Sequence, residues 1–146
     1  MLIKPPHIAF TLLILSWLLD YSFPQFRFIQ GNLRYIGILI FVAGLSMTFY
    51  SFYLFKKNKT PILPGQKPTF MVIEGMYKFT RNPMYLGVAT ALLGVSVYIG
   101  NFLALFSPLI FFLVMNFIYI PFEERLMTKL FGSKYLEYKK KVRRWI

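Results

Sequence analysis

The feature that most constrains this chain is a stretch without any charged residue over positions 82–122. At 41 residues it is about twice the ~20 residues that an α-helix needs to cross the hydrocarbon core of a bilayer. Gly100-Asn101 interrupts the stretch near its middle. Because backbone polar groups inside a membrane must be hydrogen-bonded, the stretch predicts two helices, 84–99 and 102–120, folded into a hairpin.

Two further apolar segments precede this stretch, at 5–23 and 33–55. The first begins with Pro5-Pro6, which suits a first helical turn, and the second ends at Lys56-Lys57. Composition agrees, because only 15% of the residues are charged, against about a quarter in soluble domains. We therefore expect an all-α integral membrane protein of about four transmembrane helices, forming one membrane domain over 1–146.

The basic residues are distributed unevenly around these segments. Arg27 and Arg34 lie in the loop between the first two predicted helices, whereas the other fifteen of the 17 Lys and Arg flank the opposite helix ends. Cytoplasmic loops carry the excess of Lys and Arg, so we expect both termini in the cytoplasm. A prokaryotic cell membrane is the expected location, with an endoplasmic reticulum-type membrane as the alternative.

The net charge of +12 has a simple explanation in this arrangement, since juxtamembrane lysines meet anionic headgroups, and no nucleic-acid partner is expected. A secretory signal peptide is the alternative for the first apolar segment. That segment has no small-x-small cleavage pattern, which favours a retained span.

The chain has no cysteine and a single histidine, His7. Disulfides, thiolate catalysis, cysteine or histidine metal clusters and Ser-His triads are thereby excluded, and no metal is expected. Small residues recur on one face of the second and third predicted helices, where close backbone approach would favour helix contacts. These residues are Gly37, Gly44 and Ser51, and Gly87, Ala91 and Gly94.

The first segment that breaks the apolar pattern leads into the third predicted helix, at 68–87. Pro83 suits the first helical turn, and Asn82 before it can cap the helix. The helix terminus presents free backbone N–H groups, and Gly87 would allow a ligand close to the backbone. Candidate ligand contacts are Tyr77, Tyr85 and Arg81. The alternative is a helix start at the membrane surface with interfacial tyrosines and a snorkelling arginine.

The second such segment follows the fourth predicted helix, at 121–125. Pro121 followed by Glu123-Glu124 indicates a new helix start, where carboxylates complement the helix dipole. Alternatively, carboxylates at a membrane boundary near tyrosines would suit a cationic or polyhydroxylated ligand. A short cytoplasmic helix is expected in the basic C-terminal segment.

Together these segments carry a family resemblance over residues 68–146. Residues 75–87 read Gly-x-Tyr-x-x-x-Arg-Asn-Pro-x-Tyr-x-Gly, and Glu123-Glu124 precedes Phe-Gly-x-x-Tyr-x-x-Tyr at 131–138. This pattern resembles the isoprenylcysteine carboxyl methyltransferase and phospholipid methyltransferase superfamily. The resemblance implies that S-adenosylmethionine binds at the cytoplasmic ends of the third and fourth helices, in a cofactor-binding half at 68–146.

The resemblance also implies which residues contact the cofactor. They are Thr69, Phe70, Met71 and Val72 through their backbone, then Tyr77, Asn82, Pro83, Met84, Tyr85, Gly87, Glu123 and Glu124. A sulfonium is stabilised by aromatic faces and carboxylates, and ribose hydroxyls donate well to a glutamate. Candidates for catalysis or acceptor binding are Arg81, Tyr119, Glu124 and Arg125.

Two positions depart from the prenylcysteine enzymes, which have a histidine in place of Asn82 and a substrate-handling arginine in place of Tyr119. The missing cation argues against a prenylcysteine carboxylate, so we expect a lipid amine or another small lipophile as the methyl acceptor. Two alternatives are an NADPH-dependent sterol-type reductase, which carries a similar Arg-x-Pro-x-Tyr-x-Gly element, and a non-enzymatic four-helix protein or transporter. A proton-coupled transporter would want a carboxylate inside a span.

Overall fold

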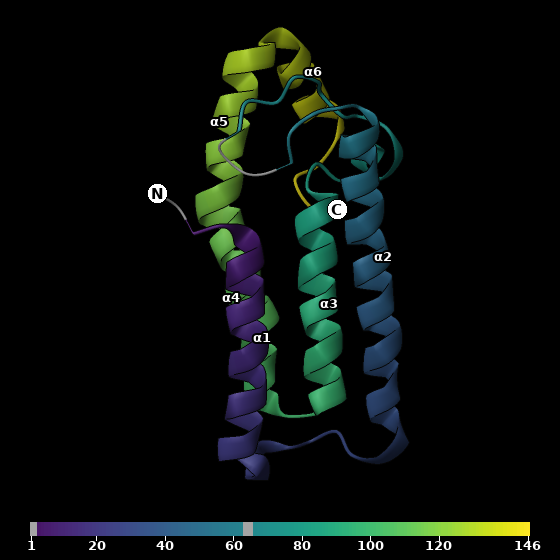
Figure 1. Ribbon diagram of the computed structural model, residues 1–146, viewed down its shortest axis with the longest axis vertical. Coiled ribbons are helices and arrows are strands. Elements are labelled where there is room, and N and C mark those ends of the chain that lie inside the picture. The colour runs from purple at the N-terminus through teal and green to yellow at the C-terminus, as the bar shows by residue number, and fades with distance from the viewer. Residues whose placement is uncertain (1–2, 63–65) are drawn as a thin grey trace.

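The structure is a computed structural model that describes residues 3–62 and 66–146, and within these ranges it contains no β-strand. Figure 1 shows long helices lying side by side. They are α1 (Pro5–Ser22), α2 (Ile36–Lys57), α3 (Pro83–Ile99) and a last rod that contains α4 (Phe106–Val114) and α5 (Ile120–Phe131). A short helix, α6 (Ser133–Lys141), follows. The 3₁₀ turns are η1 (Pro24–Phe26), η2 (Gly31–Tyr35), η3 (Gly75–Lys78) and η4 (Phe102–Leu105).

The outer surface of the helices is apolar. Leu39 is 72% exposed, Phe49 is 65% exposed and Phe117 is 70% exposed. Soluble proteins rarely expose broad apolar surface of this kind, whereas lipid solvates it well. By length and composition two helices could cross a membrane, Gly31–Lys57 and Phe102–Phe131, and α3 is a shorter apolar helix of 17 residues. The predicted class, an all-helical membrane protein, is confirmed.

The most extensive pairing in the fold joins α2 and α3, and glycines make it possible. A Cβ added to Gly44 would lie 2.4 Å from the backbone nitrogen of Ala91, and one added to Gly94 would lie 2.4 Å from that of Phe41. A Cβ on Gly37 would meet the carbonyl oxygen of Gly94 at the same distance. The predicted contact stripes are therefore confirmed, since the glycines of the two helices face each other with backbone against backbone.

The last rod is continuous through the position at which the sequence indicated a new helix. Between α4 and α5 lies a π-helical segment, η5 (Met115–Tyr119), and Pro121 sits in the first turn of α5. Proline lacks an N–H, and its ring collides with the carbonyl four residues earlier in a regular α-helix. The wider π turn accommodates the ring. The helix start indicated at Pro121 is therefore confirmed as the start of α5, although the rod continues through it without a break.

The core lies where α1, α3 and the last rod meet. It consists of Leu12, Tyr85, Leu92, Phe111, Met115, Tyr119 and Ile120. Two buried serines link α1 to α4, because the hydroxyls of Ser16 and Ser107 are 2.5 Å apart and Ser107 donates to the carbonyl of Leu12. Short hydroxyl bonds of this type satisfy polar groups between helices at little steric cost.

The loop after α1 is fastened to the connection between α3 and η4, at the end of the bundle far from α6 (Figure 1). Arg27 donates to both carboxylate oxygens of Asp20, at 2.7 and 2.5 Å, and Asn101 donates to Asp20 at 3.1 Å. Arg34 lies 4.5 Å above the ring of Tyr98 and donates to its carbonyl. Both basic residues of this loop are therefore engaged in contacts within the protein.

Candidate functional site

A cavity lies at the end of the bundle that carries α6, between the loop after α2, the start of α3 and α5. It brings together residues from both segments that the sequence singled out. Those that line it are Phe70, Val72, Tyr77, Arg81, Asn82, Met84, Tyr85, Glu123 and Glu124. Segments about forty residues apart in the sequence thus form one site.

A single hydrogen bond joins the two segments directly. Tyr85 lies in the first turn of α3, and its hydroxyl donates to Oε1 of Glu123 in α5 at 2.5 Å. The antiparallel course of α3 and the last rod brings the start of α3 beside the start of α5, near the middle of the rod (Figure 1). Pro83 fixes where α3 begins, and so fixes which turn presents Tyr85.

Glu123 has few polar partners in its half-buried position. It lies three residues beyond the apolar segment 102–120, on the wall of the cavity. Burial raises the pKa of Glu123 to about 7, although the hydrogen bond from Tyr85 acts in the opposite direction. The side chain therefore exchanges a proton near neutral pH, and a cation or hydroxyl in the cavity would favour its ionised form.

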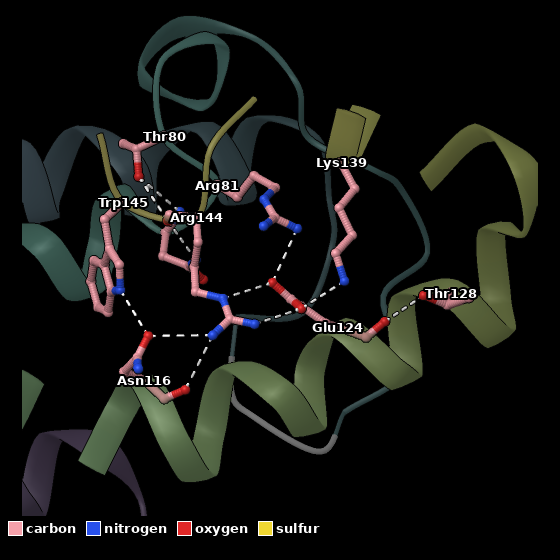
Figure 2. Close-up of polar contacts among 9 residues, drawn as sticks. Thr80, Arg81, Asn116, Glu124, Thr128, Lys139, Arg144 and Trp145 are labelled. Carbon is pink, nitrogen blue, oxygen red and sulfur yellow. Dashed lines mark hydrogen bonds and ion pairs between the residues drawn. The ribbon is translucent and has the colours of Figure 1, made fainter. Parts of the chain in front are cut away.

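The neighbouring Glu124 has the opposite surroundings, with three cations around one carboxylate (Figure 2). Arg144 donates to both of its oxygens, at 3.1 and 3.0 Å, and Lys139 donates to Oε2 at 3.0 Å. Nη1 of Arg81 lies 3.0 Å from Oε1. Burial alone would raise the pKa of Glu124, but these partners outweigh it and hold the pKa below the usual range.

Residues 143–145 cross between the start of α3 and the π-helical segment as a strap (Figure 2). On one side Arg144 donates to the carbonyl and side-chain oxygens of Asn116, at 3.4 and 3.3 Å, and Trp145 donates to the latter at 3.0 Å. On the other side the backbone N–H of Arg81 donates to the carbonyl of Arg143 at 3.0 Å. The strap thus fixes the position of Arg81 and of the α5 end that carries the glutamates.

Asn82 belongs to this arrangement and does not cap α3 with its side chain, as the sequence had suggested. Its Nδ2 donates to the carbonyl of Arg144 at 2.9 Å, and Thr80 donates to the same carbonyl at 3.2 Å. The bond to the strap uses Nδ2 as a donor, whereas a cap would use Oδ1 as an acceptor for the helix N–H groups. The strap therefore holds the Asn82 side chain in a position in which it does not cap α3.

Aromatic side chains form another wall of the cavity. Tyr77 is buried, and its ring centroid lies 5.6 Å from that of Phe55 at the end of α2. From α6, Tyr138 donates to the carbonyl of Tyr77 at 2.7 Å, and Tyr135 packs beside Tyr138. The short helix α6 therefore closes the cavity and supports the turn that carries Tyr77.

Several residues proposed from the sequence do not line the cavity. They are Thr69, Met71, Pro83, Gly87, Tyr119 and Arg125. Gly87 faces α2, where an added Cβ would lie 2.4 Å from Oγ1 of Thr48. The missing side chain of Gly87 therefore allows α2 to pack closely and leaves no room for a ligand. The hydroxyl of buried Tyr119 donates to the carbonyl of Ile3, and Arg125 is exposed on another face of α5.

The cavity also contains residues that the sequence reasoning did not select. They are Phe55, Pro61, Ile62, Gln66, Pro68, Leu126, Met127, Tyr135 and Tyr138. Leu126 and Met127 follow Glu123 by three and four positions, a helical spacing that puts them on its face and could have indicated them. Phe55 and the residues after it carry no such signal, because the loop folds back by tertiary contacts.

The sequence and the fold are similar to those of known methyltransferases. The chain matches the phospholipid methyltransferase family over residues 33–134. It is 35% identical over 79 residues to protein-S-isoprenylcysteine O-methyltransferase of Schizosaccharomyces pombe. The aligned region covers 52% of this chain and 32% of that protein. It is also 43% identical over 63 residues to an uncharacterized protein of Haemophilus influenzae. That aligned region covers 43% of this chain and 100% of the Haemophilus protein.

A solved structure of eukaryotic isoprenylcysteine carboxyl methyltransferase, described as an intramembrane Ras methyltransferase, superposes with a TM-score of 0.73 at 23% identity. The match covers 97% of this chain and 51% of that chain, and shows a common fold. Fold and matches together define the class of integral membrane methyltransferases. Within that class the chain belongs to the phospholipid methyltransferase family, whose match covers more than half of it. The chain spans about a third of the yeast relative and about half of the solved methyltransferase.

Proposed function

We propose that this protein transfers a methyl group from S-adenosylmethionine to a lipid or another small lipophilic acceptor. The observation that carries the proposal is the hydrogen bond between Tyr85 and Glu123, which joins the two family motifs at one cavity. When bound, S-adenosylmethionine supplies an electrophilic methyl group on a positively charged sulfur.

The chemistry of the cavity fits such a cofactor. The rings of Tyr77 and Tyr85 and the carboxylate of Glu123 suit a cationic centre and donating hydroxyls. Phe70 and Val72 add apolar surface against which a flat heterocycle can pack. We assign cofactor contacts to the lining residues Phe70, Val72, Tyr77, Asn82, Met84, Tyr85, Glu123 and Glu124. Phe55, Pro61 and Gln66, which precede the cofactor-binding half at 68–146, also line the cavity.

The contribution of the protein to the reaction is mainly positioning. Effective alignment of reacting groups accounts for a large part of the acceleration of a two-substrate transfer. The pairing of Glu124 with Arg144 and Arg81 holds the end of α5 against the start of α3, so the cavity walls keep their spacing. The aromatic wall around Tyr77 excludes water, which limits hydrolysis as a side reaction.

We further propose four membrane spans, at 5–23, 33–55, 84–99 and 102–120, with the last two forming a hairpin and both termini cytoplasmic. The cavity then lies at headgroup depth on the cytoplasmic face. A lipid can reach it sideways while its chains stay among apolar helix surfaces, which saves about 0.8 kcal/mol per CH₂ relative to leaving the bilayer.

A prenylcysteine carboxylate is a poor candidate for the acceptor. The residue at the expected arginine position is Tyr119, which is buried and bonded to the carbonyl of Ile3. We favour a lipid amine or another small lipophile.

Calorimetry on purified protein in detergent tests cofactor binding. Wild type is expected to bind S-adenosylmethionine and not NADPH, with at least about tenfold weaker binding in Glu123→Gln, which loses a charge-assisted contact. Tyr85→Phe should weaken binding less, because the ring remains. Glu137→Gln, on an exposed residue of α6, is the matched control and should bind like wild type. Folded wild type that fails to bind S-adenosylmethionine would refute the methyltransferase proposal.

The acceptor class is tested by incubating the protein with methyl-labelled S-adenosylmethionine and a total membrane-lipid extract. We expect label in the organic phase, and its loss in Glu123→Gln. Label confined to water-soluble products would contradict a lipid acceptor while leaving methyl transfer in place.

A further inference from the structure

Arg81 has buried hydrogen-bond donors without acceptors. Among the side chains of residues 3–62 and 66–146, the buried nitrogen and oxygen atoms that lack a hydrogen-bond partner are Nε and Nη1 of Arg81. The side chain is only 9% exposed. Nη1 lies 3.0 Å from Oε1 of Glu124, yet neither Nη1 nor Nε donates a hydrogen bond to it. Because arginine cannot lose its charge in a protein, such burial is unfavourable unless an acceptor arrives.

Glu124 does not need Arg81 to satisfy its oxygens. Arg144 donates to both of them, and Lys139 donates to Oε2. Within the described part of the chain, this corner of the cavity therefore has three cations around one carboxylate. The other glutamate of the cavity, Glu123, is bonded to Tyr85. The three cations around Glu124 therefore leave a net positive charge on this wall of the cavity.

The position of Arg81 is fixed at its backbone. Its N–H donates to the carbonyl of Arg143, and Pro83 begins α3 two residues later. The side chain lines the cavity and does not extend to the membrane surface, where a snorkelling arginine would lie. The guanidinium is thus oriented before a ligand arrives, which lowers the entropy cost of binding.

We propose that Arg81 binds an oxyanion group, a carboxylate or a phosphate, of the molecule that occupies the cavity. A planar guanidinium fork matches both groups and can donate two parallel hydrogen bonds. Glu123 would take the cationic part of the same ligand, so a ligand with charges of both signs would bind in one orientation. The identity of the occupant rests on the proposed function: the oxyanion belongs to the amino-acid part of the cofactor or to the headgroup of a lipid acceptor.

Two pairs of ligands distinguish these sources, each pair differing only in the oxyanion. The first pair is S-adenosylmethionine and its decarboxylated form, which keeps the sulfonium and the amine. The second pair is a short-chain phosphatidate and the diacylglycerol with the same chains. Binding is measured by calorimetry for wild type, Arg81→Gln, Arg81→Lys and the control Arg143→Gln, whose side chain is exposed.

We expect Arg81→Gln to weaken the oxyanion-bearing member of one pair at least tenfold and to leave its counterpart within twofold. The pair that responds identifies the source. Arg81→Lys keeps a cation beside Glu124 and so preserves the fold, but it lacks the fork, and its loss should be intermediate. Arg143→Gln should match wild type.

Equal weakening of both members of each pair would show that Arg81 only maintains the shape of the cavity, and would overturn the proposal. Unchanged affinity for all four ligands in Arg81→Gln and Arg81→Lys would do the same. A third outcome separates the two proposals. In it, wild type binds neither form of the cofactor, yet binds phosphatidate more tightly than diacylglycerol and loses that preference in Arg81→Gln. The methyltransferase proposal then fails while the oxyanion site stands.

Discussion

Glu123 and Glu124 are adjacent in α5, but their surroundings give them different properties. Glu123 faces the cavity with one tyrosine hydroxyl as its partner, whereas Glu124 is surrounded by Arg81, Lys139 and Arg144. Burial raises the pKa of the first, and ion pairs lower the pKa of the second. Neighbouring carboxyl groups with pKa values moved apart commonly differ in their roles. In the proposed site, Glu123 is the carboxyl group free to pair with a ligand, and Glu124 also joins α5 to the strap.

The raised pKa of Glu123 predicts a pH dependence of the proposed cofactor binding. A cationic or hydroxyl-donating ligand favours the carboxylate, so protonation competes with binding and affinity should rise with pH. With a pKa of about 7 the ionised fraction grows from about a tenth at pH 6 to about nine-tenths at pH 8, which gives about tenfold tighter binding. Titration calorimetry across this range should show the rise in wild type and a flat profile in Glu123→Gln. A flat profile in wild type would contradict the assignment of Glu123.

The strap depends on Arg144. Arg144→Ala removes two donors from Glu124 and releases Asn116, while Lys139 and Arg81 continue to compensate the carboxylate. Because the Arg144 side chain is 32% exposed, solvent screens part of the effect, and the expected loss of stability is about 1–2 kcal/mol. Unfolding in mixed detergent micelles measures it. Arg143→Ala, at an exposed side chain, should change stability by less than about 0.5 kcal/mol.

At the scale of the elements, α2 and α3 form the rigid pair on which the start of α3 is built. Gly44→Val would place carbon atoms 2.4 Å from the backbone of Ala91, which must then move away. We expect a loss of about 1–3 kcal/mol, the usual range for overpacking, together with weaker cofactor binding. Ala43→Val creates the same side chain one residue away on an exposed face and is the matched control. Equal stability of the two variants would show that the glycine contact contributes little.

Helix positions were largely predictable, because apolar length, proline at helix starts and paired lysines at helix ends act locally. The π-helical segment was not predictable, since no residue type specifies it and it arises from the conflict between Pro121 and a regular helix. The partner of Asn82 was also hidden, because the carbonyl of Arg144 lies 62 positions away in sequence.

The residues of the candidate site that belong to the two sequence motifs could be predicted. Tyr85, Glu123 and Arg81 were selected from sequence, and the structure places all three on the cavity. The strap was not foreseen, because Arg143-Arg144 in the sequence is one more part of a basic run. Gly87 was assigned to ligand approach from its lack of a side chain, but a glycine does not reveal which neighbour comes close until the packing is known.

At the scale of the whole molecule, the uneven basic residues give a test of orientation. Reporter fusions after Lys59 and after Ile146 should both report the cytoplasm, and a fusion after Asn101 should report the opposite side, because flanking Lys and Arg are retained in the cytoplasm. A cytoplasmic result at Asn101 would contradict the hairpin of 84–99 and 102–120.

The contacts of Arg27 and Arg34 have an electrical consequence. With one neutralised by Asp20 and the other covered by Tyr98, the end of the bundle far from the cavity offers no strong attraction to anions through these two side chains. At the cavity end, exposed lysines cluster, among them Lys56, Lys78, Lys134, Lys140 and Lys141. We therefore expect counterions and anionic amphiphiles to be more concentrated at the cavity end, within a Debye length of about 8 Å at physiological salt. On the same ground we expect negatively charged lipid to be enriched beside the cavity, and added salt to disperse it without altering the cavity itself.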